Sequence, residues 1–365
     1  MLPFFGARFG NPSSAHRWGR EARTALDEAR ERVAHCIGAH ADEICFTSCG
    51  TESDNLAILG SWRALRGKGR SAIVTTPIEH KAVIEAVHAA SREGAEERFL
   101  PVPGGIIDDA AFSEMVDGKA ALVSAMWVNN EIGTVQDVPR LAAAAKNAGA
   151  VFHTDAVQAF GKVDVDAKAT PFDLLAISGH KIGAPKGIGA LYIRRGTPIE
   201  RLFHGGSQDR GRRPGTENVA FVVGLARAAE IAVAEREGEC ARLGALRDDL
   251  ERALLAGIPD AVIHCRDSAR APHIISISVP GVESESLLMA MDLAGVACSA
   301  GSACQTGSDS GSHVLFAVGV SPALADAAIR LSLGPMTTAE AVARVAAILP
   351  NLVDRMRGLS VAANQ

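Results

Sequence analysis

Lys181 stands where an enzyme built on a sheet would carry a reactive amine. It directly follows Ser-Gly-His, and the apolar run at 172–177 before it is typical of a buried strand. We therefore expect Lys181 at the carboxyl end of a strand, entering a tight glycine-rich turn. In open α/β sheets, ligands bind at that edge. A lysine there can form a Schiff base with a carbonyl compound.

Other strand ends carry polar residues of types that bind ligands. Asp155 and Gln158 follow a strand pattern, and His80 stands at a strand–helix turn. Each also has an ordinary structural explanation, because an aspartate often starts a helix and a histidine near a helix start often caps it.

Gly50 and Thr51 open a helix pattern that follows another strand pattern. The free backbone N–H groups and the dipole at a helix start favour a phosphate group. The structural alternative is an ordinary cap at Thr51, with Glu52 and Asp54 in the first turn.

Together these residues meet the requirements of pyridoxal 5'-phosphate. This cofactor needs a lysine for its Schiff base and an acid opposite its pyridine nitrogen. It also needs a phosphate cradle. Lys181 supplies the amine and Asp155 the acid. The other expected roles are phosphate binding by Gly50, Thr51, Ser178 and His180, ring stacking by His80, and a hydrogen bond from Gln158 to the ring hydroxyl.

The elements that must position these residues follow an alternating pattern. Helix and strand patterns alternate over the first two thirds of the chain, which favours a mostly parallel sheet covered by helices on both faces. A large α/β domain is expected at 1–238 and a smaller α+β domain at 239–365. The expected strands are 43–47, 71–76, 121–127, 150–154, 172–178, 188–193 and 273–279, and the expected helices are 14–38, 52–67, 80–94, 140–149, 219–257 and 338–357.

Composition excludes several classes of function. The 365 residues carry a net charge of −5, and no basic cluster stands out beyond the stretch at 209–215, so nucleic-acid or membrane-surface binding is not indicated. The apolar runs are too short to span a bilayer, and the first residues do not read as a signal peptide. Seven cysteines without a Cys-x-x-Cys pair argue against a disulfide framework and favour a reducing cytoplasm.

A set of stretches across the chain resembles the cysteine desulfurases, which are enzymes of the class V aminotransferase group, and most closely their nitrogen-fixation type. The resemblance implies fold type I of the pyridoxal-phosphate enzymes, with a mostly parallel seven-stranded sheet. The stretches that carry it are FGNPSSAH, FTSCGTESDN, VNNEIGT, FHTDAVQAFGKV, SGHK, APKGIGALYIRRG, GRRPGTENV, SAGSAC and IRLSLG.

The resemblance also implies roles for four further residues. Asn130 would lie beside the cofactor and the substrate, and Arg330 would bind the substrate carboxylate. Thr216 would reach the phosphate of a neighbouring subunit, which implies a homodimer. Cys304, in a segment of small polar residues that we expect to be mobile, would receive the sulfur. That thiol is also a candidate transient ligand of an iron–sulfur cluster shared with a scaffold protein.

The implied reaction converts L-cysteine to L-alanine and leaves a persulfide on Cys304 for iron–sulfur cluster assembly. A selenocysteine lyase or another class V enzyme is the main alternative. A second alternative is an N-terminally truncated form with impaired activity, because the initial strand usual in the family does not precede Phe9 here. The chain also has Asp309-Ser310-Gly311 where the family tends to have Leu-Glu-Pro, and Phe316 where an arginine is common.

Overall fold

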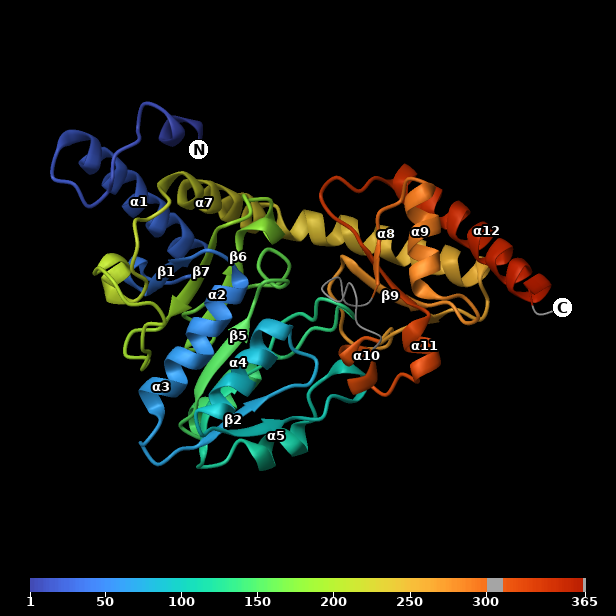
Figure 1. Ribbon diagram of the computed structural model, residues 1–365, viewed down its shortest axis with the longest axis horizontal. Coiled ribbons are helices and arrows are strands. Elements are labelled where there is room, and N and C mark those ends of the chain that lie inside the picture. Colours follow the sequence, from blue (N-terminus) through green and yellow to red (C-terminus); the bar gives the residue numbers. More distant parts are fainter. Residues whose placement is uncertain (301–310, 364–365) are drawn as a thin grey trace. The chain divides into compact units, whose positions relative to one another are not determined.

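The computed structural model describes residues 1–300 and 311–363 (Figure 1). Cys304 lies outside the described residues. The chain forms two compact units. The first comprises residues 1–100, 108–128 and 136–236, and the second comprises residues 101–107, 129–135 and those from 237 onward. The expected division at residue 238 did not anticipate that two earlier segments belong to the second unit, and separate domains at 1–238 and 239–365 stay a prediction.

A seven-stranded sheet forms the centre of the first unit, in the order β1-β7-β6-β5-β4-β2-β3. β7 runs antiparallel to β1 and β6, and the other neighbours are parallel. Most strands are short apolar runs buried on both faces, as covering helices require. The mostly parallel sheet expected from the sequence is confirmed. The strands are β1 (Ile44–Thr47), β2 (Ala72–Thr75), β3 (Glu96–Phe99), β4 (Ala120–Ser124), β5 (Val151–Asp155), β6 (Leu174–Ser178) and β7 (Gly189–Ile193).

Helices with small buried residues cover this sheet. In α1, for example, the buried Ala22, Leu26, Ala29 and Val33 recur at helical spacing and so form one apolar face. Figure 1 shows α1 beside α7, in agreement with their packing. The helices of the first unit are α1 (Arg17–Cys36), α2 (Gly50–Asn55), α3 (Ser61–Leu65), α4 (Lys81–Arg92), α5 (Asp109–Met115), α6 (Val138–Asn147) and α7 (Val219–Ala234), with a π-helical turn η3 (Leu56–Gly60) and short turns η1 (Leu2–Phe5), η2 (Ala41–Glu43), η5 (Gly179–Ile182) and η6 (Gln208–Gly211).

The register of the strands brings several loops to one edge of the sheet. Gly189 pairs with Thr47 at the end of β1 and with Ser178 at the end of β6. Asp155, at the end of β5, pairs with Ala176 of β6. The segments that follow β1, β5 and β6 therefore leave the sheet at the same edge, where parallel sheets bind ligands.

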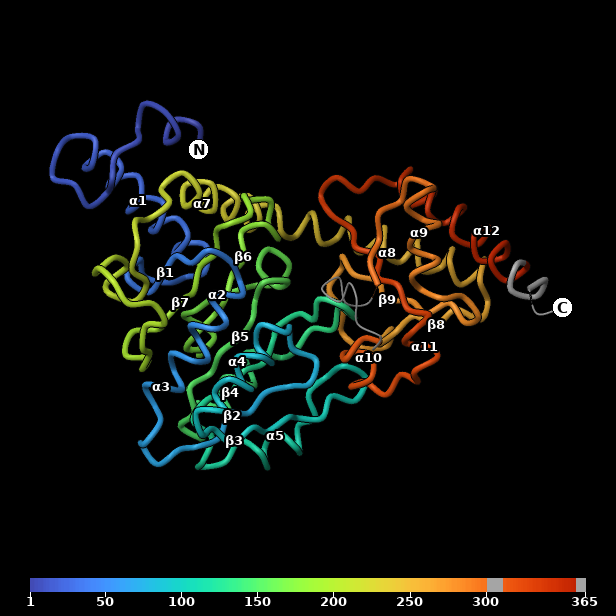
Figure 2. Tube along the Cα trace, viewed as in Figure 1, coloured from blue at the N-terminus to red at the C-terminus, as the bar shows by residue number. Residues whose placement is uncertain are grey.

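The second unit is built around a four-stranded antiparallel sheet in the order β10-β11-β9-β8. One face packs Ile275, Ile277 and Ile329 into a core with leucines of the long helices. Figure 2 traces β8 beside β9. Its elements are η4 (Pro103–Gly105), α8 (Arg236–Gly257), β8 (Val262–Ile263), β9 (Ile274–Ser278), α9 (Ser284–Leu293), β10 (Ser299–Ala300), α10 (His313–Ala317), α11 (Pro322–Asp326), β11 (Ala328–Ser332) and α12 (Ala339–Ala363). Over the described parts of both units, each helix is too short or too polar to cross a membrane.

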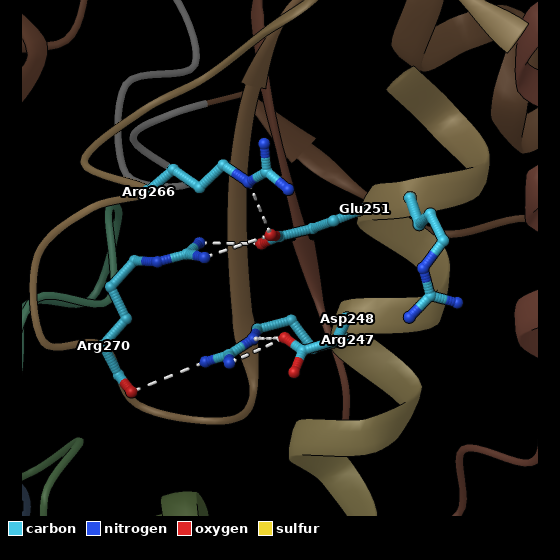
Figure 3. Close-up of a pocket in the computed structure, with 6 residues that line it drawn as sticks. Arg247, Asp248, Glu251, Arg266 and Arg270 are labelled. Atoms are coloured by element: carbon cyan, nitrogen blue, oxygen red, sulfur yellow. Dashed lines mark hydrogen bonds and ion pairs between the residues drawn. The ribbon is translucent and has the colours of Figure 1, made fainter. Parts of the chain in front are cut away.

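A buried ion pair holds the loop before β9 against α8. Arg270 donates to both carboxylate oxygens of Glu251, at 2.7 and 3.1 Å, and both side chains are about 5% exposed or less. Arg266 lies 3.9 Å from the same carboxylate. The pair lines a cavity of about 300 Å³. Figure 3 shows the pair there, together with Arg247, which donates two hydrogen bonds to Asp248 Oδ1. Arg247 and Arg270 each already have a carboxylate partner there. We therefore infer that the pair of Glu251 and Arg270 stabilises the fold.

Glu251→Ala should therefore destabilise the protein by about 3–5 kcal/mol, because it leaves Arg270 buried without a counter-charge. Urea unfolding followed by circular dichroism measures this loss. Asp249→Ala is the matched control on the same helix. Its pair with Arg252 is exposed, so that change should cost less than about 1 kcal/mol. Equal losses in the two variants would contradict this account.

Candidate functional site

The start of α2 lies directly against the ends of two strands. A Cβ atom on Gly50 would come within 2.8 Å of Val157 Cγ2 and 3.4 Å of Ser178 Cβ. Gly50 is buried, whereas Thr51 is exposed. The glycine thus allows the first N–H groups of the helix to approach the edge where β5 and β6 end.

The helix that starts at Gly50 is longer than α2 alone. α2, η3 and α3 follow one another without a gap from residue 50 to residue 65 and pass through a π-helical turn. The residue at the N-cap is Cys49, so the ordinary cap considered at Thr51 is not what the structure shows. Glu52 accepts a hydrogen bond from Ser48 N at 2.7 Å and from Arg213 at 3.0 Å, which holds the turn before the helix in place.

Asp155 presents a buried carboxyl at the end of β5. The residue is 4% exposed, and its Oδ1 accepts a hydrogen bond from Val157 N at 2.8 Å. Burial, together with the nearby carboxyl of Asp54, raises the pKa of Asp155 to about 7. The described turn at 156–163 contains no helix. The alternative explanation that Asp155 starts a helix is therefore wrong. A cation facing this carboxyl would favour its charged form.

Lys181 lies in η5, immediately after β6, and its side chain is exposed. Gly183 closes the turn with φ +83, a conformation that glycine adopts without strain. In the same segment, Ser178 Oγ and His180 Nδ1 lie 2.9 Å apart in a hydrogen bond. Burial, then the charges of Lys181 and Lys186, lowers the pKa of His180, which favours a neutral imidazole.

His80 is the N-cap of α4, so the capping role considered for it in the sequence is confirmed. Its Nδ1 accepts a hydrogen bond from Ala82 N at 3.1 Å. A neutral His80 therefore carries its proton on Nε2. Gln158 lies half-buried in the turn after β5, three residues beyond Asp155. The cap does not remove a further role for His80, because it uses only one ring nitrogen.

Thr216 is exposed and lines a cavity of about 240 Å³ in the first unit. Phe46, Thr47 and Ser48, which lead to Gly50, line the same cavity. The segment that carries Thr216 is anchored by Asp209, whose buried carboxylate pairs with Arg30 at 2.6 Å. The structure thus brings Thr216 to the loop that precedes the helix start.

Asn130 and Arg330 belong to the second unit. Arg330 lies on β11, and its Nη1 donates to Asn130 O at 2.9 Å. Both residues are half-buried. The bond joins two residues that the sequence separates by 200 positions.

Comparisons with known proteins give the family. The model of the class-V aminotransferases matches residues 1–345. A cysteine desulfurase IscS of Dictyoglomus turgidum is 45% identical over 361 residues, covering 99% of this chain and 91% of the relative. The chain belongs to the cysteine desulfurases of the class-V aminotransferase family. The cysteine desulfurase NifS of Azotobacter vinelandii is 43% identical over 99% of this chain and 90% of its own length. A solved NifS-like protein is 36% identical with a TM-score of 0.90, covering 97% of this chain and 94% of that one.

Membership of this family implies dependence on pyridoxal phosphate, and the residues of the first unit fit that group. The raised pKa of Asp155 suits a carboxyl that becomes ionised when a cationic ring nitrogen faces it. The contacts of Gly50 with Val157 and Ser178 leave no room for a side chain beside a phosphate. The amine of Lys181 follows the strand next to that of Asp155.

The structure also reveals site residues that the sequence patterns did not single out for a role. Asp54, Glu79 and His153 are fully buried around Asp155. Each comes from a different element, so linear spacing gave no signal beyond their polarity within apolar runs. Among the described residues, no group of three or more histidine, cysteine or acidic side chains is arranged to hold a metal ion.

Proposed function

We propose that this protein is a cysteine desulfurase that uses Lys181 and Asp155 to operate pyridoxal phosphate. The activity converts L-cysteine to L-alanine and passes the sulfur to Cys304. The observation that carries the proposal is the register of β5 and β6, which places a buried carboxyl and a lysine at one sheet edge. Full-length relatives that are cysteine desulfurases support the same activity.

When bound, pyridoxal phosphate supplies an electron-accepting ring that stabilises negative charge at the substrate Cα. Asp155 would face the ring nitrogen with a negative charge, and Lys181 Nζ would take the proton from Cα. The N–H groups of Gly50 and Thr51 would hold the phosphate, together with Ser178 and His180. The imidazole of His80 would lie against the ring, and Gln158 would donate to the ring hydroxyl.

The substrate carboxylate is assigned to Arg330, because a guanidinium binds a carboxylate through two parallel hydrogen bonds. The bond from Arg330 Nη1 to Asn130 O orients that guanidinium. His80 Nε2, which carries the proton in the neutral ring, exchanges a proton with the substrate thiol. Asn130 would also lie beside the bound cofactor.

Cys304 receives the sulfur in this proposal. Its thiolate attacks the sulfur of the substrate, the new S–S bond forms, and the Cβ–S bond breaks with its electron pair leaving on carbon. Protonation of that carbon completes L-alanine, and Cys304 retains a persulfide. An ordinary cysteine has a pKa of about 8.5, so a small fraction is thiolate at neutral pH.

The persulfide would pass to an iron–sulfur scaffold protein, where Cys304 can serve as a transient cluster ligand. The protein is proposed to act as a homodimer in which Thr216 reaches the phosphate site of the other subunit. The reducing cytoplasm predicted from the cysteine count stays a prediction.

The test is to supply L-cysteine with a thiol reductant and to quantify L-alanine and sulfide together. The proposal predicts equal amounts of both products, with a rate that depends on pyridoxal phosphate. Selenocysteine and cysteine are compared in parallel. Turnover of selenocysteine alone would favour the selenocysteine lyase alternative and would contradict this proposal.

Gly50→Ala should weaken cofactor binding by about 10- to 100-fold, since a Cβ would push the helix start away from Val157 and Ser178. Fluorescence titration of the cofactor-free protein measures the affinity. The matched control is Gly118→Ala, because a Cβ at Gly118 has open space around it. Wild-type affinity in Gly50→Ala would count against a phosphate site at this helix.

A further inference from the structure

Asp54 and His153 form a buried pair close to Asp155. His153 Nε2 faces Asp54 Oδ1 at 3.5 Å, and the two side chains are 0% and 1% exposed. His153 Nδ1 is hydrogen-bonded to Ser124 Oγ at 2.8 Å. Neither His153 Nε2 nor Asp54 Oδ1 has a hydrogen-bond partner among the described residues.

The pair connects the two elements that hold opposite ends of the proposed cofactor. Asp54 lies in α2, four residues after Gly50, and points toward the sheet. His153 lies in β5, two residues before Asp155, so both project from the same face of the strand. A shift of α2 relative to β5 would therefore disturb the phosphate end and the ring-nitrogen end together.

The titratable groups around the pair are carboxyls and histidines. Those that interact with Asp155 or lie against the pair are Asp54 from α2, Glu79 and His80 from the turn before α4, and His153 from β5 itself. Glu79 Oε1 accepts hydrogen bonds from Thr76 Oγ1 and Met126 N, each at 2.8 Å. Several carboxyls buried this closely do not all ionise at neutral pH, because each charge opposes the next.

Burial decides which group keeps a proton. It raises the pKa of Asp54 to about 8 and lowers that of His153 to about 4, so both are neutral at neutral pH. A protonated Asp54 can donate toward His153 Nε2, while His153 Nδ1–H donates to Ser124 Oγ. His153 thus provides an acceptor without adding a charge.

We propose that Asp54 and His153 are a positioning pair that stays neutral, with the proton on Asp54, so that Asp155 alone carries the charge facing the ring nitrogen. This inference rests on the proposed function for the identity of the cationic ring. Its main statement is that Asp54 is protonated and hydrogen-bonded to His153. That statement holds whether or not a cofactor is bound.

Infrared spectroscopy of the cofactor-free protein tests whether Asp54 is protonated and hydrogen-bonded to His153. At neutral pH, the wild type should show the carbonyl band of a buried carboxylic acid that Asp54→Asn lacks. His153→Leu removes the acceptor and should move the band to the frequency of an unbonded acid, whereas His153→Gln, whose amide oxygen accepts the same bond, should restore it. Asp173→Asn is the control, because Asp173 binds Phe152 N at the far end of β5. A wild-type spectrum in Asp54→Asn would overturn the inference.

The cofactor-bound protein gives a second measurement that separates the two proposals. With cofactor ¹⁵N-labelled in the ring, the nitrogen should hold its proton at neutral pH in Asp54→Asn as it does in the wild type, because asparagine replaces a carboxyl that is already neutral. Loss of the ring proton at neutral pH in Asp54→Asn would show that Asp54 carries a charge, and would overturn the inference alone. A protein that takes up no cofactor would instead refute the proposed function, and the infrared result would still decide the state of Asp54.

Discussion

Lys181→Ala should lower the conversion of cysteine to alanine by at least about 10³-fold. The variant loses the amine that links the cofactor and moves the Cα proton, while its fold is kept because Lys181 is exposed on η5. The visible absorbance of the linked cofactor should disappear as well. Absorbance spectra and alanine quantitation measure the two effects on the same samples.

Lys186→Ala is the matched control for this change. Lys186 is an exposed lysine in the same glycine-rich segment, five positions further on. That variant should keep both the absorbance and the activity. Loss of activity in Lys186→Ala but not in Lys181→Ala would move the cofactor link to another amine.

Cys304→Ser should keep the cofactor absorbance and reduce sulfide release to the background of the cofactor-free protein. A serine hydroxyl does not accept a sulfur atom as a thiolate does, so the Cβ–S bond of the substrate stays intact. Sulfide assays and mass spectrometry of the persulfide measure the two effects. In the wild type, the extra sulfur should lie on Cys304.

Cys298→Ser controls for the loss of a thiol close to Cys304 in sequence. Cys298 packs against the core of the second unit, and burial raises its pKa, which makes it a poor nucleophile. Its replacement should leave desulfuration unchanged. Undiminished sulfide release by Cys304→Ser would show that the sulfur goes elsewhere.

Local patterns predicted the parts of the site that lie at strand ends. The apolar run before Lys181 is β6, and the run before Asp155 is β5. Such runs are informative because a strand that helices cover on both faces buries every side chain and is therefore apolar. The positions of these two residues at one edge then followed from the parallel pairing of neighbouring strands.

Features that depend on contacts between distant residues were not predictable. β3 was missed because its residues are charged, and Arg98 there forms ion pairs with Glu96 and Asp117 at the sheet edge. Pro350 lies inside α12, which continues through it although a proline usually interrupts a helix. The polar cluster of Asp54 and His153 joins a helix to a strand, and neither sequence pattern refers to the other.

Reductive trapping identifies the residue that holds the cofactor, which we propose is Lys181. The protein reconstituted with pyridoxal phosphate is treated with borohydride, digested and examined by tandem mass spectrometry. The mass of the reduced cofactor should lie on Lys181. If that mass lies on a different lysine, or on none, Lys181 does not hold the cofactor.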